Sequence, residues 1–479
     1  MPQVNKTREN IEFLLGHEKV SFSFNGDITP TTTLLQYLRG SYKYKGTKEG
    51  CNIGDCGACT IVIAELNNNF LVYKAVNSCL LLLPQIHGKQ IITVEHLINN
   101  GHLHPVQKAM VNLHASQCGF CTPGFVMSMF SLYKQVNKPS LEDIQETFAG
   151  NLCRCTGYNS ILKAAFNAFD NKTPDHFELN IQNTIKTLQT IDNSSALFVN
   201  KTQTYYTPNN LNDALDYLKK HKQATIVNGA TDEAIKLSKQ YESDISIIDL
   251  NLIKDLNRID EDNNNLNIGA LVNLQDLHEY VGNIYPTFTE LLLYFGSKQI
   301  RNRATLSGNI AAASPIGDTL PFLMAINAQI KLMGLGTERI VPIKQFIIGY
   351  HKTDLKQNEL ITEIIIPKAK STNISATYKV SKRLDLDISS VSIGVKLKLN
   401  KQNVVIDISV FYGGMAEITK PAVALANFLL NKDWNEENVM AASKLIEKDF
   451  NPISDARAEA EGRIIMAQNL FIKFWHEHE

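Results

Sequence analysis

Eight cysteines, all in the first third of the chain, constrain this sequence more than any other feature. They stand at positions 51, 56, 59, 79, 118, 121, 153 and 155, and residues 156–479 contain none. They form two sets of four, spaced C-x4-C-x2-C-x19-C and C-x2-C-x31-C-x-C, with no cysteine left over. Two complete sets indicate two sites that each take four sulfur ligands.

Three kinds of site use cysteines in this way. Disulfides are typical of small secreted chains, whereas this chain has 479 residues and no signal-peptide pattern at its N-terminus. Structural zinc prefers short C-x2–4-C knuckles. The C-x4-C-x2-C spacing of the first set is instead the plant-type [2Fe–2S] spacing, and Gly54, Gly57 and Ala58 let the backbone approach a cluster. The second set is compatible with zinc or with a second [2Fe–2S] cluster.

Composition excludes several other classes of protein. Lys plus Arg number 47 and Asp plus Glu 48, so the chain has no charge excess for nucleic acid or an anionic membrane. Its apolar stretches are far shorter than the ~18 residues of a spanning helix. We expect about three domains from the length. We also expect a cytoplasmic location, with neither nucleic acid nor membrane as a partner.

The first 170 residues change from a strand pattern to a helix pattern. In residues 1–95, Val20, Phe22 and Phe24 alternate before Asn25-Gly26, a strong hairpin signal. A short helix is expected over 33–39, and strands over 60–66 and 70–76. In residues 96–170 four helices are expected, which predicts a compact bundle. Their starts are marked by Pro105, Pro123, a capping box of Ser140 with Asp143, and Ser160.

The remaining chain is expected to form a linker followed by two α+β regions. Residues 171–200 are polar without a clear period and are expected to be a linker. Residues 201–367 form the next domain, with strands expected at 224–227, 245–250, 266–268, 328–333 and 360–366. A boundary at Pro367 precedes the last domain, 368–479, with strands at 376–381, 391–399 and 403–412 and three closing helices near 421–430, 435–448 and 456–474.

Two loops have the composition of a flavin site. Neither G-x-G-x-x-G opening a βαβ unit nor G-x4-G-K-[ST] occurs, so a Rossmann or P-loop site is unsupported. The strand over 224–227 instead runs into Asn-Gly-Ala-Thr, where backbone N–H groups can bind a diphosphate. A second stretch of small and hydroxyl residues covers 305–309 and 313–318, and Asp318 can accept hydrogen bonds from a ribityl chain. Both stretches are equally compatible with ordinary turns.

Taken together, these motifs resemble the xanthine dehydrogenase family over essentially the whole chain. The most specific matches are EGCNIGDCGACT (49–60), the lone Cys79, QCGFCTPG (117–124) and NLCRCTGY (151–158). The resemblance implies a [2Fe–2S] cluster in a ferredoxin-like β-grasp domain, held by Cys51, Cys56, Cys59 and Cys79. It implies a second [2Fe–2S] cluster in a four-helix domain, held by Cys118, Cys121, Cys153 and Cys155.

The same resemblance implies that the third domain, 201–367, binds FAD and that an α+β domain closes the chain. The matching stretches are VNGATD (227–232), SPIGD (314–318), YKVSKR around Lys379 and FYGGM (411–415), whereas TLSGN (305–309) has Ser307 where glycine is usual. Asp385 and Asp387 lie where the family places residues near the flavin ring. The implied FAD-binding residues are Val227, Asn228, Gly229, Ala230, Thr231, Asp232, Phe295, Thr305, Gly308, Asn309, Asp318 and Lys379.

The implied function is the electron-transfer half of xanthine dehydrogenase. Purine hydroxylation would occur at a molybdopterin cofactor on a partner large subunit, in an assembly of two small and two large chains. Electrons would then pass through both [2Fe–2S] clusters to FAD and NAD⁺. Two alternatives remain open: a subunit of another molybdenum hydroxylase, acting on an aldehyde or N-heterocycle, and a non-catalytic electron carrier.

Overall fold

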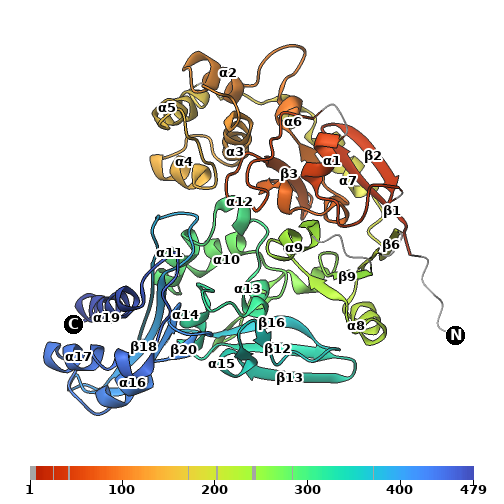
Figure 1. Ribbon diagram of the computed structural model, residues 1–479. Helices are drawn as coiled ribbons and strands as arrows, with labels where there is room; N and C mark the ends of the chain where they lie inside the picture. Colours follow the sequence, from red (N-terminus) through yellow and green to blue (C-terminus); the bar gives the residue numbers. More distant parts are fainter. Residues whose placement is uncertain are drawn as a thin grey trace. The chain divides into compact units, whose positions relative to one another are not determined.

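The computed structural model describes residues 7–24, 26–40, 44–170, 172–200, 203–239, 244–282, 284–369 and 372–479. The chain divides into two compact units (Figure 1). Unit 1 comprises Met1–Tyr217, Gln223–Ile253 and Gly296–Ala304, and unit 2 comprises Leu218–Lys222, Lys254–Phe295 and Thr305–Glu479. The expected FAD-binding segment, 201–367, therefore contributes residues to both units.

The first part of unit 1 is a five-stranded mixed sheet in the order β2-β1-β5-β3-β4. Its elements are β1 (Asn10–Leu15), β2 (Glu18–Ser23), α1 (Leu34–Gly40), β3 (Thr60–Asn67), β4 (Phe70–Asn77) and β5 (Gln90–Ile92). The hairpin of β1 and β2 turns at Gly16, which has a φ of +60°. The expected turn at Asn25-Gly26 lies beyond the end of β2, and Asn25 is outside the described residues. Alternating side chains therefore located a strand correctly but not the turn that pairs it.

Four helices follow, in the stretch where four were expected. They are α2 (Pro105–Asn112), α3 (Thr122–Gln135), α4 (Leu141–Phe148) and α5 (Asn159–Ala168). Helix α3 is buried along most of its length and contacts α2, α4, β3 and β4 (Figure 1). The capping box of Ser140 with Asp143 is present. The expected cap at Ser160 is wrong, because α5 starts after Tyr158, whose φ of +68° turns the chain into the helix.

The stretch expected to be an irregular linker, 171–200, contains two helices and a strand. Helix α6 (His176–Leu179) is followed by α7 (Ile181–Gln189) and β6 (Ala196–Asn200). Asp175 caps α6 by accepting hydrogen bonds from the backbone N–H groups of Phe177 and Glu178 at 2.9 and 3.0 Å. Phe177 and Leu188 are buried in unit 1. The linker expectation is wrong because a few apolar side chains on one helix face suffice to dock a polar segment.

A second sheet of unit 1 has the order β6-β7-β9-β8. Its strands β7 (Gln203–Thr207), β8 (Thr225–Val227) and β9 (Ile245–Asp249) are parallel, and β6 is antiparallel to β7. Helices α8 (Leu211–Lys220) and α9 (Glu233–Lys239) alternate with these strands, as parallel pairing requires. The short helix α12 (Lys298–Arg301) also belongs to unit 1.

Unit 2 contains two antiparallel sheets, β10-β11-β16-β12-β13 and β17-β18-β19-β20, and the small hairpin β14-β15. In the second large sheet, Ile393, Val395 and Leu397 lie in a core shared with helices α16, α17 and α19 (Figure 1). The strands are β10 (Ile259–Glu261), β11 (Asn265–Gly269), β12 (Gln329–Gly334), β13 (Thr337–Pro342), β14 (Ile347–Gly349), β15 (Lys352–Thr353), β16 (Leu360–Pro367), β17 (Asn373–Val380), β18 (Val391–Leu399), β19 (Val405–Gly413) and β20 (Lys420–Pro421). The helices are α10 (Leu274–Val281), α11 (Pro286–Leu293), α13 (Leu306–Ala312), α14 (Leu320–Ala325), α15 (Ile343–Phe346), α16 (Val423–Leu429), α17 (Glu436–Ser443), α18 (Ile446–Asp449) and α19 (Ala460–Glu477).

Within the described ranges, every helix is too short or too polar to cross a lipid bilayer.

Candidate iron–sulfur and flavin sites

The first cysteine set lies in the loop between α1 and β3 and in the turn after β4. The sulfur of Cys51 accepts hydrogen bonds from the backbone N–H groups of Asp55 and Cys56, at 3.2 and 3.3 Å. Cys59 and Cys79 are buried, and their sulfurs are 3.3 Å apart. A loop that directs backbone N–H groups at sulfur stabilises thiolate, which is the form that binds metal.

The four thiols of this set interact in two pairs. A hydrogen bond from the Cys56 thiol, together with backbone N–H groups, lowers the pKa of Cys51 to about 5. A hydrogen bond from Cys79 likewise lowers the pKa of Cys59, and the pKa of each donor thiol rises in return. Within each pair, one sulfur is therefore favoured as the thiolate, the form that binds metal.

The second set connects the start of α3 with the loop before α5. The sulfurs of Cys118 and Cys155 are 3.5 Å apart and exposed. Cys153 is buried, which opposes ionisation, but the hydroxyl of Thr156 at 3.1 Å and two backbone N–H groups lower its pKa to about 7. Burial and a hydrogen bond with Cys153 raise the pKa of Cys121 to about 12. This set also consists of two interacting pairs.

In each set, one pair of sulfurs is close enough to bind the same metal atom. In the described part of the chain, no three Cys, His, Asp or Glu side chains are arranged to share a single metal ion. The measured separations, 3.3 Å for Cys59–Cys79 and 3.5 Å for Cys118–Cys155, are much longer than a disulfide. They are close to the ~3.7 Å between two thiolates on one tetrahedral metal at ~2.3 Å. Two sulfurs per metal atom is the ligand number of each iron in a four-cysteine [2Fe–2S] cluster.

The first expected flavin loop lies in unit 1, at the carboxyl end of β8. Gly229 touches another segment so closely that a Cβ atom there would lie 1.8 Å from the carbonyl oxygen of Arg303. Ala230 has a φ of +61°, and the exposed Asp232 pairs with Lys236 at 3.1 Å. Val227 is buried, and Asn228 and Thr231 complete the loop. The chain therefore turns at Gly229 and Ala230, and both residues are buried.

The second expected group lies in unit 2, at the start of α13. Thr305 caps the helix by accepting a hydrogen bond from the N–H of Gly308 at 3.1 Å. Ser307, the departure from the family pattern, is buried and donates its hydroxyl proton to the carbonyl of Ala270 at 2.6 Å. The side chain thus fits without displacing the helix start. The side-chain oxygen of Asn309 accepts a hydrogen bond from the hydroxyl of Thr319 at 2.6 Å.

Asp318 and Lys379 form a buried ion pair in unit 2. Their charged atoms are 2.7 Å apart, and the two side chains are 9% and 6% exposed. The second carboxylate oxygen of Asp318 accepts the hydroxyl proton of Ser389. Lys379 also donates to the backbone carbonyl of Asp387, at 2.7 Å. Both oxygens of Asp318 therefore have partners within the protein, which the sequence-based assignment to a ribityl chain did not foresee.

The expected flavin residues fall into separate groups. Residues 227–232 belong to unit 1, whereas Phe295, residues 305–318 and Lys379 belong to unit 2. Phe295 and Asp385 are half-buried. The backbone carbonyl of Asp387 joins the Asp318–Lys379 pair, and its carboxylate accepts the backbone N–H of Arg383 at 2.9 Å.

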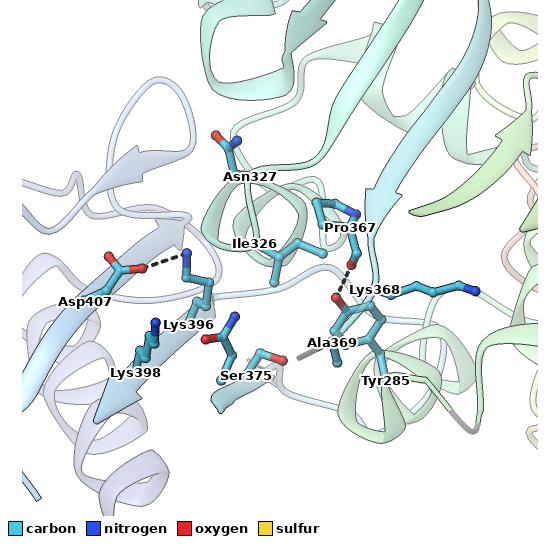
Figure 2. A pocket seen from close by; sticks show the side chains of 11 residues that line it. Tyr285, Ile326, Asn327, Pro367, Lys368, Ala369, Ser375, Lys396, Lys398 and Asp407 are labelled. Carbon is cyan, nitrogen blue, oxygen red and sulfur yellow. Dashed lines mark hydrogen bonds and ion pairs between the residues drawn. The ribbon is translucent and has the colours of Figure 1, made fainter. Parts of the chain in front are cut away.

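Unit 2 also has a cavity of about 310 Å³ (Figure 2). In it Lys396 and Asp407 form an ion pair 2.9 Å long, and the tyrosine hydroxyl of Tyr285 donates to the carbonyl of Pro367. The residues that line it do not include any of the expected flavin residues.

Three buried polar residues belong to these sites and were missed by the sequence analysis. Ser389 binds Asp318, while Asn151 and Gln299 join the two cysteine segments of unit 1. Asn151 stands two positions before Cys153. An amide side chain so close to an expected cysteine ligand is a weak sequence signal of a supporting role at the site. Gln299 is 148 residues away from Asn151 along the chain, so only the fold brings them together.

Three protein-family models match the chain. The "[2Fe-2S] binding domain" covers residues 93–166, and the "FAD binding domain in molybdopterin dehydrogenase" covers 200–369. The "CO dehydrogenase flavoprotein C-terminal domain" covers 376–478.

Curated relatives match almost the whole chain. Xanthine dehydrogenase from Emericella nidulans is 31% identical and covers 98% of this chain, and xanthine dehydrogenase 1 from Arabidopsis thaliana is 31% identical and covers 93%. Xanthine dehydrogenase/oxidase from Rattus norvegicus is 30% identical and covers 98%. The chain spans only 38–39% of the length of these relatives.

Solved structures agree at the level of fold. Carbon monoxide dehydrogenase from Hydrogenophaga pseudoflava, in a form lacking the Mo-pyranopterin moiety of its molybdenum cofactor, is 25% identical with a TM-score of 0.53, covering 56% of this chain and 94% of that one. Quinoline 2-oxidoreductase from Pseudomonas putida 86 is 22% identical with a TM-score of 0.53. The match covers 58% of this chain and 97% of the quinoline 2-oxidoreductase chain. The chain therefore combines a [2Fe–2S]-binding domain, an FAD-binding domain of the molybdopterin dehydrogenase type and a CO dehydrogenase flavoprotein C-terminal domain, and over almost its whole length it is similar to xanthine dehydrogenases.

Proposed function

We propose that this chain is the electron-transfer subunit of a molybdenum-dependent xanthine dehydrogenase that uses NAD⁺. The observation that carries the proposal is the grouping of the eight cysteines into two sets within one unit, each with one sulfur pair at a separation that one metal atom can bridge, 3.3 Å for Cys59–Cys79 and 3.5 Å for Cys118–Cys155. The names of the full-length relatives support the purine substrate. When bound, the clusters carry single electrons and the flavin exchanges electron pairs with a nicotinamide nucleotide.

The cysteine assignments follow from this proposal. Cys51, Cys56, Cys59 and Cys79 would hold one [2Fe–2S] cluster in the N-terminal sheet, which we assign to the β-grasp class because a five-stranded mixed sheet packs on α1. Cys118, Cys121, Cys153 and Cys155 would hold the other in the four-helix domain. The protein's own contribution is to aim backbone N–H groups at sulfur and to exclude water from Cys59 and Cys79.

For FAD, the backbone of residues 228–231 is proposed to bind the diphosphate, because this turn directly follows strand β8 and contains the small residues Gly229 and Ala230. Thr305, Gly308 and Asn309 are proposed to bind another part of the cofactor from the start of α13. The ion pair of Asp318 with Lys379 is proposed to orient this region, since both oxygens of Asp318 already have partners.

The molybdenum cofactor and the purine are proposed to bind to a large partner subunit, in a complex of two small and two large chains. The exposed sulfurs of Cys118 and Cys155 support this arrangement, because an electron donor must approach the second cluster from outside the chain. Phe120 and Tyr158, near this set in sequence, are exposed aromatic residues that a partner would cover.

The purified chain tests the proposal directly. We expect four irons, four acid-labile sulfides and one noncovalent FAD per chain, and reduction of an artificial dye by NADH. Xanthine should reduce the dye only after the large subunit is added. Zinc in place of iron, FMN in place of FAD, or dye reduction by xanthine without molybdenum would contradict the proposal. Activity of the complex on an aldehyde or N-heterocycle, but not on xanthine, would contradict the proposed substrate but not the proposed cofactors.

A further inference from the structure

The two cysteine sets meet at a junction in unit 1 where three backbone segments touch. A Cβ atom at Gly57, in the loop of the first set, would lie 2.1 Å from the carbonyl oxygen of Gly150, just before Cys153. A Cβ atom at Gly124, just after Cys121, would lie 2.2 Å from the carbonyl oxygen of Gly57. No side chain fits between these segments, so the two sets are held as close as their backbones allow.

Hydrogen bonds hold this junction together. The backbone N–H of Leu152 donates to the carbonyl of Cys56 at 3.0 Å, so a residue next to a ligand of the second set binds a ligand of the first. The side-chain amide of Asn151 donates to the carbonyl of Gly57 at 3.1 Å. Asn151 is 3% exposed, which shields its bond to Gly57 from competing water.

Asn151 is itself held from the other side. Its Oδ1 atom accepts hydrogen bonds from the hydroxyl of Ser128 at 2.6 Å and from Nε2 of Gln299 at 2.9 Å. Gln299 is 1% exposed and also donates to Ser128, at 3.0 Å. It lies on α12, which is anchored by Arg301 bonding to Glu146 at 2.6 Å. Asn151 therefore cannot rotate without breaking bonds to both sides.

We propose that Asn151 and Gln299 act as a clasp that fixes the spacing and orientation of the two iron–sulfur sites. The inference rests on the proposed function, because it concerns how two clusters exchange electrons. It adds that α12, which lies within the stretch matched by the FAD-binding family model, supplies the residue that holds Asn151 in place between the two cluster sites. Asn151 and Gln299 are positioning residues, since neither is a cysteine ligand.

The test is to remove the clasp while leaving all eight cysteines intact. Gln299→Leu deletes the bonds to Asn151 and Ser128 with little change in volume. Gln107→Leu is a matched control, because Gln107 is also a buried glutamine of unit 1 but bonds to the carbonyl of Val94, at 3.0 Å. Iron and sulfide content, the thermal unfolding midpoint and EPR spectra of the fully reduced chain are measured for each.

We expect Gln299→Leu to retain four irons and both individual EPR signals but to lose the magnetic splitting between the two reduced clusters. The Gln107→Leu control should keep the splitting. Unchanged splitting in Gln299→Leu would overturn the proposal. If that variant does not fold, Ser128→Ala removes the two bonds that Ser128 makes with Asn151 and Gln299 but keeps the direct bond between Asn151 and Gln299, and it should weaken the splitting. Loss of iron from both variants would also count against a spacing role.

The wild-type chain separates this inference from the proposed function. A wild type without two [2Fe–2S] signals would refute the proposed function. A wild type with both signals and with splitting that survives in Gln299→Leu would refute only the clasp.

Discussion

Replacing Lys379 by Met tests whether the buried pair with Asp318 stabilises unit 2 or serves only a cofactor. Lys379 is 6% exposed and donates to Asp318 and to the carbonyl of Asp387, each at 2.7 Å. Without the ammonium group, the carboxylate of Asp318 stays buried with only the hydroxyl of Ser389 as a partner. Breaking a buried pair in this way costs about 3–5 kcal/mol. We therefore expect Lys379→Met to lower the free energy of unfolding by that amount, even without flavin.

A double-mutant cycle makes the expectation quantitative. Asp318→Asn should cost a similar ~3–5 kcal/mol, so independent effects would sum to ~6–10 kcal/mol. The double variant Asp318→Asn with Lys379→Met has no unpaired charge and should cost no more than ~2 kcal/mol. Both tryptophans, Trp434 and Trp475, lie in unit 2, so intrinsic fluorescence during urea unfolding follows the relevant unit.

Two outcomes of the cycle would refute this reasoning. The first is a change below ~1 kcal/mol for Lys379→Met, which is the range of an exposed ion pair. The second is a double variant whose cost equals the sum of the single costs, which would mean that the two residues act independently. Either result would show that the contact between Asp318 and Lys379 contributes little to the stability of unit 2.

The remaining predictions concern unit 1. Burial, together with the charge of Arg8, lowers the pKa of His87 to about 4, so the folded state binds this proton only near pH 4, whereas the unfolded state binds it near pH 6.5. Stability should be complete above pH 6.5 and decline as the pH falls toward 4, and His87→Gln should flatten the pH dependence of the unfolding midpoint. An equally steep decline in that variant would show that other groups cause it. Gly57→Ala should lower iron content and cost about 2–5 kcal/mol, because Gly57 has a φ of +66° and a Cβ atom would collide with Gly150. Gly26→Ala is the control, with a similar φ of +65° but no atom within 4 Å of the added Cβ, and an equal iron loss there would refute the contact argument.

Local sequence patterns predicted the elements that local physics determines. The capping box at Ser140 and the strand at 60–66 are present because capping and side-chain alternation act within a few residues. The cysteine spacing likewise predicts metal chemistry, since a loop of fixed length allows only certain sulfur arrangements. The two loops of small residues were compatible with ordinary turns, and it was the family resemblance that implied the FAD-binding domain, which the family model matches over 200–369.

Local patterns failed where distant residues decide the outcome. The polar stretch 171–200 is helical because Asp175 caps a helix and also binds Lys134, at 2.5 Å, in a buried site that no local pattern reveals. The N-terminal hairpin turns at Gly16 rather than at Asn25-Gly26, because β1 finds its register by pairing with both β2 and β5.

The cysteine spacing alone predicted two four-sulfur sites, because the eight cysteines fall into two complete sets of four. Only the tertiary structure decided how the sulfurs pair and what holds the two sites together. Cys59 meets Cys79 across 20 positions of sequence, and Asn151 meets Gln299 across 148. Such contacts depend on burial, which makes each hydrogen bond obligatory, and burial is set by the packing of the whole unit rather than by neighbouring residues.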